Sequence, residues 1–320
     1  MTARKRRSKN ALTLGGAVAL LVILLIAAAA LFEGGGLPGI WSESPAPAPS
    51  APPAASASQP SGAGGGELRL HVLKVGKADC LLLRCGGQSL LLDGGNDADE
   101  AYIFNYLDGL GITKLDYVVN SHPHEDHLGS LDAVVLKYRP TVAFLSPKTH
   151  TTRNYEDLLL ALDEAGSEVI IPAAGEGFAL GGAQIEFLSP EKGAEFGDNI
   201  NDWSLVMLLR MGNDRLLFMG DAESKAESAL LAGGFDLRAD LIKIGHHGSN
   251  TSSKKSFLQA VLPKIAVITC DKDEEKGAPN EKVLKRLEEL GVEVHRTDLE
   301  GNLVFVSSGD GITLENGAGR

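Results

Sequence analysis

The sequence predicts a mixed α/β domain in which two sheets are covered by helices, with one hydrophobic helix before it. Three observations support this prediction. Apolar strand patterns alternate with helical patterns over residues 67–320, an uncharged apolar run occupies residues 11–32, and a segment rich in proline and small residues lies between them. The hydrophobic content of 43% excludes a wholly disordered chain, and three cysteines in 320 residues exclude a disulfide-dense mini-protein.

The N-terminal segment has the pattern of a membrane anchor. Residues 1–10 are basic and contain no acid, and residues 11–32 contain no charge. About 20 apolar residues cross a bilayer core as a helix, and a basic cluster favours the cytoplasmic side. We therefore expect residues 1–10 inside, residues 11–32 as a transmembrane anchor and the rest of the chain outside. A cleaved secretory signal is the open alternative, since residues 27–30 are all alanine. A buried soluble helix is disfavoured.

Residues 33–66 are predicted to be a linker. Pro, Ala, Ser and Gly fill almost every position from Ser44 onward, which leaves too little apolar side chain to offset the entropy of ordering. The folded domain is therefore expected at residues 67–320.

The charge of the exported part limits its partners. The chain has 30 basic and 42 acidic residues, and residues 1–32 hold five of the basic ones and no acid, so 25 − 42 leaves a net charge of −17 beyond residue 32. Such a charge disfavours non-specific binding to nucleic-acid backbones. Only a basic stripe at the site, such as Lys243, Lys254 and Lys255, would offset it. These lysines are otherwise expected to be solvated.

The first half of the domain begins with strand patterns at residues 68–75, 79–84 and 89–93, the last two joined by a hairpin turn at Gly86-Gly87. A helix at 101–110 ends at Gly111, and the apolar strand 116–120 follows. Helical spacing returns at 131–138 and 155–165, on either side of a strand at 142–145. The three cysteines have no zinc-knuckle spacing, and we expect buried free thiols; pairing of Cys80 or Cys85 with Cys270 is the alternative.

The second half repeats these patterns. Apolar runs predict strands at residues 184–188, 204–210, 215–219, 241–244 and 265–269. Residues 223–231 have helical periodicity. Near the end, Asn280 is a predicted N-cap for a helix that places Val283, Leu284, Leu287 and Leu290 on one face and stops at Gly291.

Ser121-His122-Pro123-His124-Glu125-Asp126-His127 carries the strongest chemical signal, directly after the strand 116–120. Neutral imidazole and carboxylate are ligands of Zn²⁺, Mn²⁺ and iron. His122 and His124 alternate on an extended segment and can serve one metal site, while Asp126 and His127 can serve a second. Packing does not require three histidines at a strand end, so a purely structural explanation is disfavoured.

Two later strand ends carry matching residues. Asp221 follows the apolar run 216–219, and His246 and His247 follow the strand 241–244. Alone, each would more often be a turn or surface residue. Beside the histidine cluster they predict a pair of cations bridged by a carboxylate, an arrangement suited to displacement at phosphorus or carbon.

The series His122-x-His124-x-Asp126-His127, Gly220-Asp221 and His246-His247-Gly248-Ser249 resembles the metallo-β-lactamase superfamily. Within it, residues 68–305 resemble the hydrolase domain of ComEC-type competence proteins, which also occurs as a stand-alone exported protein. Further marks of this subgroup are Val75-Gly76-Lys77-Ala78-Asp79, Leu92-Asp93-Gly94-Gly95, Asn201-Asp202-Trp203-Ser204-Leu205-Val206 and Arg296-Thr297-Asp298-Leu299-Glu300-Gly301. The resemblance implies a four-layer αββα sandwich that binds two divalent metal ions, Zn²⁺ or Mn²⁺, at one sheet edge.

The resemblance also implies a role for each residue. His122 and His124 would hold the first metal, Asp221 would bridge, and the second metal would take Asp126, His127 and one of the pair His246 and His247. Which of the two late histidines binds metal and which faces substrate is left open. The residues expected to act in catalysis are Asp126, Asp221, His246 and His247. Asp93 would orient a histidine ligand, or else be a turn carboxylate, and outer or substrate contacts are expected from Asn201, Ser204 and Ser249.

The chain departs from the family pattern in two places. Many members supply another histidine before the bridging aspartate, but none occurs here between His150 and His246. Asn201, Asp202 and Ser204 occupy that region, so we expect a weakly held first metal completed by water or an oxygen ligand, which makes Mn²⁺ as suitable as Zn²⁺. Members of the subgroup often have His-Pro before their last helix, whereas this chain has Ala278-Pro279. A contact to the substrate is therefore expected to be missing.

The resemblance implies an exported, metal-dependent phosphodiesterase or nuclease that acts on DNA, with Ser249, Thr251 and Ser252 as candidate phosphate contacts or, more simply, capping residues. An esterase that acts on phosphorylcholine or teichoic-acid phosphodiesters of a cell surface is the second hypothesis. A non-catalytic metal-binding module is the third. The subgroup marks disfavour β-lactam or lactone hydrolysis, and the sequence indicates no protein partner.

Overall fold

The computed structural model describes residues 66–271 and 278–315. The predicted basic N-terminus 1–10, the apolar run 11–32 and the linker 33–66, except its last residue, lie outside the described residues, so these assignments stay predictions. Within the described ranges, no helix has both the length and the apolar character needed to cross a membrane.

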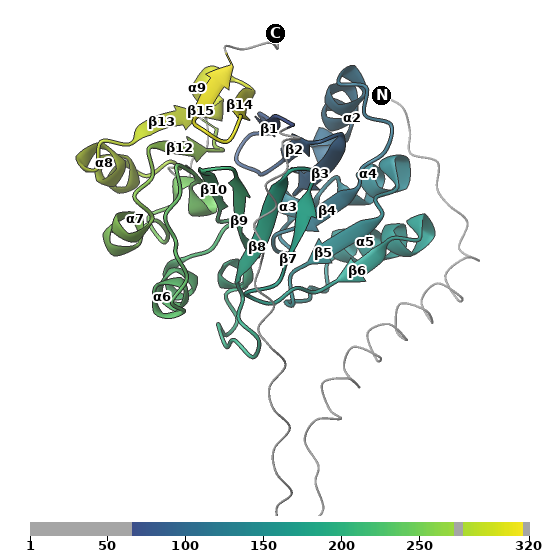
Figure 1. Cartoon of the computed structure of the whole chain (residues 1–320). Helices are drawn as coiled ribbons and strands as arrows, with labels where there is room; N and C mark the ends of the chain where they lie inside the picture. Colours follow the sequence, from purple (N-terminus) through teal and green to yellow (C-terminus); the bar gives the residue numbers. More distant parts are fainter. Residues whose placement is uncertain (1–65, 272–277, 316–320) are drawn as a thin grey trace, which may run out of the picture. The chain divides into compact units, whose positions relative to one another are not determined.

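Two sheets face each other (Figure 1). In the described residues the first sheet has the strand order β15-β14-β1-β2-β3-β4-β5-β6, and the second has the order β13-β12-β11-β10-β9-β8-β7. The first sheet comprises β1 (Leu68–Val72), β2 (Leu81–Cys85), β3 (Gln88–Leu92), β4 (Tyr117–Asn120), β5 (Val142–Leu145), β6 (Glu168–Ile170), β14 (Leu303–Ser307) and β15 (Ile312–Glu315). The second comprises β7 (Gly177–Leu180), β8 (Ala183–Ser189), β9 (Val206–Met211), β10 (Asp214–Phe218), β11 (Leu241–Lys243), β12 (Ile265–Ile268) and β13 (Glu293–Arg296).

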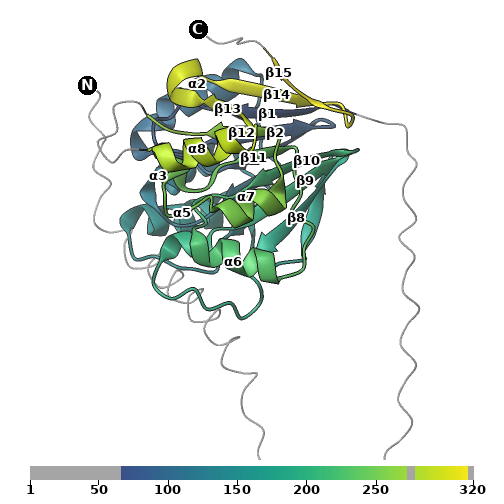
Figure 2. The same cartoon turned by 90° about the vertical axis from the view of Figure 1, so that its left-hand side faces the viewer.

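Helices cover the outer face of each sheet (Figures 1 and 2). The first sheet is covered by α2 (Glu100–Gly109), α4 (Leu131–Tyr138) and α5 (Arg153–Ala165), and the second by α6 (Ser224–Ala232), α7 (Lys255–Val261) and α8 (Glu281–Glu289). One apolar core lies between the sheets, and each helical layer packs on a core of its own. This is the predicted αββα sandwich.

Local sequence signals set several of these elements. The Asn280 side chain accepts a hydrogen bond from the Lys282 backbone N–H at 3.0 Å and caps α8, as predicted. Val283 and Leu287 are buried on its inner face. The three cysteines are buried free thiols, as expected.

Some predicted boundaries were wrong. The first strand ends at Val72 rather than residue 75, because the chain then leaves the sheet and the Asp79 N–H donates to the Asp126 carbonyl. Ser204 lies between the short 3₁₀ turn η2 (Ile200–Trp203) and β9, not in a strand. The sequence reading also missed β6, β7, β13, β14, β15 and the helix α7.

The parallel strand pairs determine where a site can form. Strands β3, β4 and β5 run parallel in the first sheet, and β10, β11 and β12 run parallel in the second. In sheets of this kind the loops that follow the carboxyl ends of the strands form the ligand site. The loops after β4, β10 and β11 carry the predicted metal ligands.

Candidate metal centre

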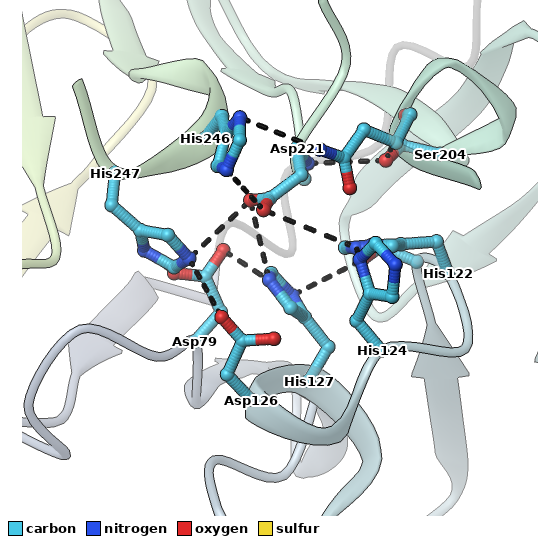
Figure 3. Close-up of polar contacts among 12 residues, drawn as sticks. Asp79, His122, His124, Asp126, His127, Ser204, Asp221, His246 and His247 are labelled. Carbon is cyan, nitrogen blue, oxygen red and sulfur yellow. Dashed lines mark hydrogen bonds and ion pairs between the residues drawn. The ribbon is translucent and has the colours of Figure 1, made fainter. Parts of the chain in front are cut away.

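Side chains from both sheets converge at this edge (Figure 3). The short helix α3 (Glu125–Leu128) and the segment before it supply four of them, the loop after β10 supplies one, and the 3₁₀ turn η3 (Gly245–Gly248) after β11 supplies two. The residues are His122, His124, Asp126, His127, Asp221, His246 and His247. The structure thus brings together every predicted metal ligand.

Asp221 divides the cluster, because its two carboxylate oxygens face different partners. Oδ1 lies 3.2 Å from His127 Nε2 and 3.5 Å from His247 Nε2. Oδ2 lies 3.9 Å from His122 Nε2 and 3.7 Å from His246 Nε2. A carboxylate with donor atoms on both sides can bind two cations at once.

The Oδ1 side is the tighter of the two. Asp126, His127, Asp221 and His247 each present one ligand atom, and these atoms lie within 4.8 Å of one another. His247 Nε2 is 3.6 Å from Asp126 Oδ2. His127 Nε2, Asp221 Oδ1 and His247 Nε2 are buried, and none of them makes a hydrogen bond within the described part of the chain.

These three atoms provide a test of whether a metal fits. A buried polar atom without a partner costs free energy, and three such atoms that point at one another are rare in a folded protein. Two imidazole nitrogens, from His127 and His247, and two carboxylates, from Asp126 and Asp221, form a donor set expected for Zn²⁺ or Mn²⁺. The residues present therefore fit a divalent cation.

On the other side, His122 and His124 form a looser pair. His122 Nε2 and His124 Nδ1 lie 2.9 Å apart and face each other. The other ring nitrogen of His122 lies 3.1 Å from the Ser121 hydroxyl oxygen, and Ser121 donates its own proton to Asp93. His122 Nδ1–H can thus donate to Ser121, which leaves its Nε2 lone pair directed at His124 and Asp221.

Hydrogen bonds from Nδ1 set the orientation of the buried rings of His127 and His247. His127 Nδ1–H donates to Asp93 Oδ2 at 2.8 Å, and Asp93 is itself held by the Ser121 N–H at 2.7 Å. His247 Nδ1–H donates to the Thr269 carbonyl at 3.0 Å. Each bond places the proton on Nδ1 and leaves Nε2 as the ligand atom. Asp93 therefore contacts a candidate ligand directly and is not merely a turn carboxylate.

His246 and His247 differ in position, although both have left-handed backbone angles, with φ of 49° and 51°. Such angles are uncommon for residues other than glycine and concentrate at functional sites. They turn the two rings in different directions: His247 is fully buried within the ligand set, whereas the side chain of His246 is 22% exposed. His246 Nδ1–H donates to Glu223 Oε1 at 2.9 Å.

The remaining predicted residues lie around this centre. The Ser204 hydroxyl accepts from the Asp221 N–H at 3.1 Å and donates to the Asn201 carbonyl at 2.8 Å. The Asn201 amide nitrogen donates to Glu223 at 3.0 Å, while its Oδ1 is buried and has no hydrogen-bond partner in residues 66–271 and 278–315. The Ser249 hydroxyl pairs with the Thr251 hydroxyl at 2.9 Å, and the Thr251 hydroxyl oxygen lies 3.2 Å from His246 Nδ1.

Two glycines allow the loops to approach one another. At Gly220, φ is +51° and a Cβ would lie 3.0 Å from the Ser121 side chain and 3.1 Å from Ser204 Cβ. At Gly248, φ is +80° and a Cβ would lie 2.8 Å from Pro279. Both positions require glycine for conformation and for space. The second contact also places Pro279 beside the histidine turn.

The side chains of the cluster influence one another's charge. Burial lowers the pKa of His122 well below its usual value, with the nearby His127 charge adding to the effect. Burial also opposes the charge on His127, but Asp221 and Asp93 outweigh it and hold its pKa well above the usual value. Burial likewise disfavours ionised Asp221, yet His247 and His127 lower its pKa strongly. The site is therefore an electrostatically coupled set, as at many functional sites.

The sequence reading missed four participants: Asp79, Glu223, Lys243 and Thr269. Lys243 was expected to be solvated or to join a basic stripe with Lys254 and Lys255, and both expectations were wrong. Lys243 is 1% exposed, with Nζ 2.5 Å from Asp79 Oδ2. Lys255 pairs with Glu289, and Lys254 Nζ donates to the Asn250 carbonyl. The available signal for Lys243 was its place in the apolar run 241–244, which ends just before two histidines.

Comparisons with known proteins agree with this geometry. A family model described as Metallo-beta-lactamase superfamily matches residues 73–270. The chain is 30% identical over 207 residues to ComE operon protein 3 of Bacillus subtilis (strain 168), which covers 64% of this chain and 26% of that protein. It is also 30% identical over 241 residues to Competence protein ComA of Neisseria gonorrhoeae, covering 75% and 32%. The chain thus spans between a quarter and a third of the length of these relatives.

Among solved structures, the metallo-β-lactamase fold protein YhfI from Bacillus subtilis superposes with a TM-score of 0.51 at 13% identity, covering 76% of this chain and all of that one. This likeness shows the fold alone. The sequence match over residues 73–270 includes all seven converging residues.

Proposed function

Because the chain belongs to the metallo-β-lactamase superfamily, we propose that it is a metal-dependent hydrolase that cleaves phosphodiesters and that its substrate is DNA. The observation that carries the proposal is a group of three buried atoms that have no hydrogen-bond partner in the described part of the chain: His127 Nε2, Asp221 Oδ1 and His247 Nε2. Support for DNA comes from the resemblance to competence proteins, and one relative is named Competence protein ComA.

Two cations have separate donor sets in this proposal. Asp126, His127 and His247 would hold one of them together with Asp221, and His122 and His124 would hold the other, also with Asp221. Asn201 Oδ1 is assigned to the His122–His124 set, because it is buried, has no hydrogen-bond partner among the described residues and lies in the segment where a histidine is missing. An oxygen donor there suits Mn²⁺ as well as Zn²⁺.

Each side chain has a distinct part in the reaction. Divalent cations at this site supply the activation of water and the neutralisation of phosphoryl charge that displacement at phosphorus requires. Asp93 and the Thr269 carbonyl keep His127 and His247 in the required tautomer. His246, fixed by Glu223 and partly exposed, is assigned the contact with the substrate.

The second candidate is an esterase for small phosphodiesters of a cell surface, such as phosphorylcholine groups. The net charge of −17 beyond residue 32 favours it, and so does the burial of Lys243, which removes the expected basic stripe. Both candidates use the same metal centre and differ only in the polymer or ligand bound.

One assay separates these candidates. The purified full chain, loaded with Zn²⁺ or Mn²⁺, is tested on single-stranded DNA, duplex DNA and bis-p-nitrophenyl phosphate. Cleavage of DNA that is lost in a chelator supports the nuclease, and cleavage of the small diester alone supports the esterase. Bound metal without turnover on any phosphodiester contradicts both and leaves a binding module.

The location of the domain is part of the proposal. We place residues 11–32 in a membrane, or in a cleaved signal, with residues 67–320 on the outer side. Protease added to intact cells that express the full chain should then degrade the domain. A domain that stays protected until the cells are lysed contradicts the export.

A further inference from the structure

Lys243 is the last residue of β11, is buried, and pairs with Asp79 of the candidate metal centre. Its ammonium group lies 2.5 Å from Asp79 Oδ2 and donates a longer hydrogen bond of 3.4 Å to the Gly220 carbonyl. Asp79 is also 1% exposed. A lysine and an aspartate are rarely buried completely, because both lose their hydration, and the pair is seldom more stabilising than apolar residues of the same volume. Stability alone is therefore a weak reason for this pair.

Asp79 lies behind both buried histidines of the tighter site (Figure 3). Its Oδ1 is 3.5 Å from His247 Nδ1, and its Oδ2 is 3.8 Å from His127 Nδ1. The Thr269 hydroxyl donates to Asp79 Oδ1 at 2.5 Å, and the Thr269 carbonyl accepts from His247. Asp79 thus contacts the side of each ring that faces away from the candidate metal.

Asp79, Asp93 and His127 also bring their ligand atoms within 4.8 Å of one another, a grouping that could itself attract a cation. The ammonium of Lys243 already supplies a positive charge to this group through Asp79. Without Lys243, Asp79 and Asp93 would be two buried carboxylates around one histidine. The lysine therefore provides a fixed positive charge at this group, where a free metal ion would otherwise compete with the Asp126–His127–Asp221–His247 site.

We propose that Lys243 is a positioning residue for the metal centre, which holds Asp79 in place behind His127 and His247 and thereby sets the metal affinity of the Asp126–His127–Asp221–His247 site. The inference rests on the proposed function only in that this site binds a divalent cation. Lys243 and Asp79 contact neither metal nor substrate and act through the two imidazole rings. Supporting groups of this kind typically change metal affinity by 10- to 100-fold.

The alternative is an ion pair that only stabilises the fold. The two explanations separate in a set of full-chain variants: Lys243→Met, Asp79→Asn and the double variant. Unfolding temperature in a chelator reports on the fold, and competition with a chromophoric chelator reports on Zn²⁺ affinity. The ligand-field spectrum of the Co²⁺-loaded protein reports on the geometry of the two histidines. Lys255→Met, which breaks an exposed pair with Glu289, is the matched control.

Lys243→Met should lower the unfolding temperature, because it leaves a buried carboxylate unpaired. The double variant should recover most of that loss, yet its Zn²⁺ affinity should stay about 10- to 100-fold below wild type, with an altered Co²⁺ spectrum. Lys255→Met should match wild type in all three measurements. If the double variant folds poorly, Lys243→Gln with Asp79→Asn keeps a neutral hydrogen-bonded pair and is measured instead.

A double variant with wild-type affinity and an unchanged Co²⁺ spectrum contradicts the inference and leaves the proposed hydrolase intact. A wild-type chain that binds no divalent cation contradicts the proposed metal centre itself, and the inference with it.

Discussion

His127 Nε2 and Asp221 Oδ1 approach to 3.2 Å, although one follows a strand of the first sheet and the other a strand of the second. Neither atom makes a hydrogen bond within the described residues. The two halves of the sandwich thus meet at a ring nitrogen and a carboxylate oxygen that are both candidate ligand atoms. A cation at this point would link the sheets as well as serve chemistry.

Metal should therefore stabilise the fold. At a free metal concentration of about 100 times the dissociation constant, binding to the native state alone adds about 2.7 kcal/mol to the free energy of unfolding. For a domain of this size that raises the unfolding temperature by about 5–10 °C. Thermal unfolding with and without Zn²⁺ measures the shift, and His295→Ala, outside the site, is the control. Identical curves in Zn²⁺ and in chelator contradict the link.

The two late histidines should have separable effects. His247→Ala removes a ligand atom, so we expect at least about tenfold weaker metal binding together with loss of turnover. His246→Ala should keep the metal and its stabilising effect but lower kcat by about 10²- to 10³-fold, because only the substrate contact is lost. Metal content and kinetics of the two variants, measured in parallel, test this. Loss of metal in His246→Ala would instead make His246 a ligand.

Asn201 should affect one of the two cations. Removing its side-chain oxygen with Asn201→Ala should weaken the cation at His122 and His124 by about tenfold and leave the cation at Asp126, His127 and His247 unchanged. Asn201→Asp should retain both, because it keeps an oxygen donor. Metal titration followed by calorimetry resolves the two binding steps. Two unchanged steps in Asn201→Ala would show that its buried oxygen is not a ligand.

His71 gives the fold a pH dependence that is independent of the site. Burial, reinforced by Arg84 and Arg69, lowers the pKa of His71 to about 4, against about 6.5 in the unfolded chain. The unfolded chain thus binds the proton more tightly. The stabilisation is complete above pH 6.5 and is lost as the pH falls through about 4.

His71→Gln retains an acceptor for the Tyr106 hydroxyl, which lies 2.9 Å from His71 Nδ1. The difference in unfolding free energy between wild type and His71→Gln should therefore shrink by on the order of 2 kcal/mol between pH 7 and pH 4. Denaturant titrations at several pH values measure it. Parallel pH profiles for the two proteins would rule out the shifted histidine.

The sequence predicted the parts of this molecule in which neighbouring residues determine the outcome. The apolar spacing of α8 and its Asn280 cap are local, and so is the strand that ends at the histidine motif. The edge strands β13 and β15 were missed because their patterns are short and partly exposed, and they become strands only by pairing with β12 and β14. The inner strand β14 was missed although most of its residues are buried.

The same distinction holds for the site. His122 to His127 were identified from spacing, whereas Asp79, Glu223 and Thr269 look like ordinary loop residues until the fold places them behind a histidine. The choice between His246 and His247 could not be made from sequence, since two consecutive left-handed residues decide where each ring points. Lys243 was misjudged because a charged residue at a strand end is usually solvated.

The most direct test of the metal centre is the metal content of the purified full chain, compared with Asp221→Asn, by mass spectrometry after loading and dialysis. The wild type should retain about two divalent ions per chain, and the variant should retain less than about one, because both sets share the Asp221 carboxylate. Equal metal content in the two proteins, or none in the wild type, would contradict the account.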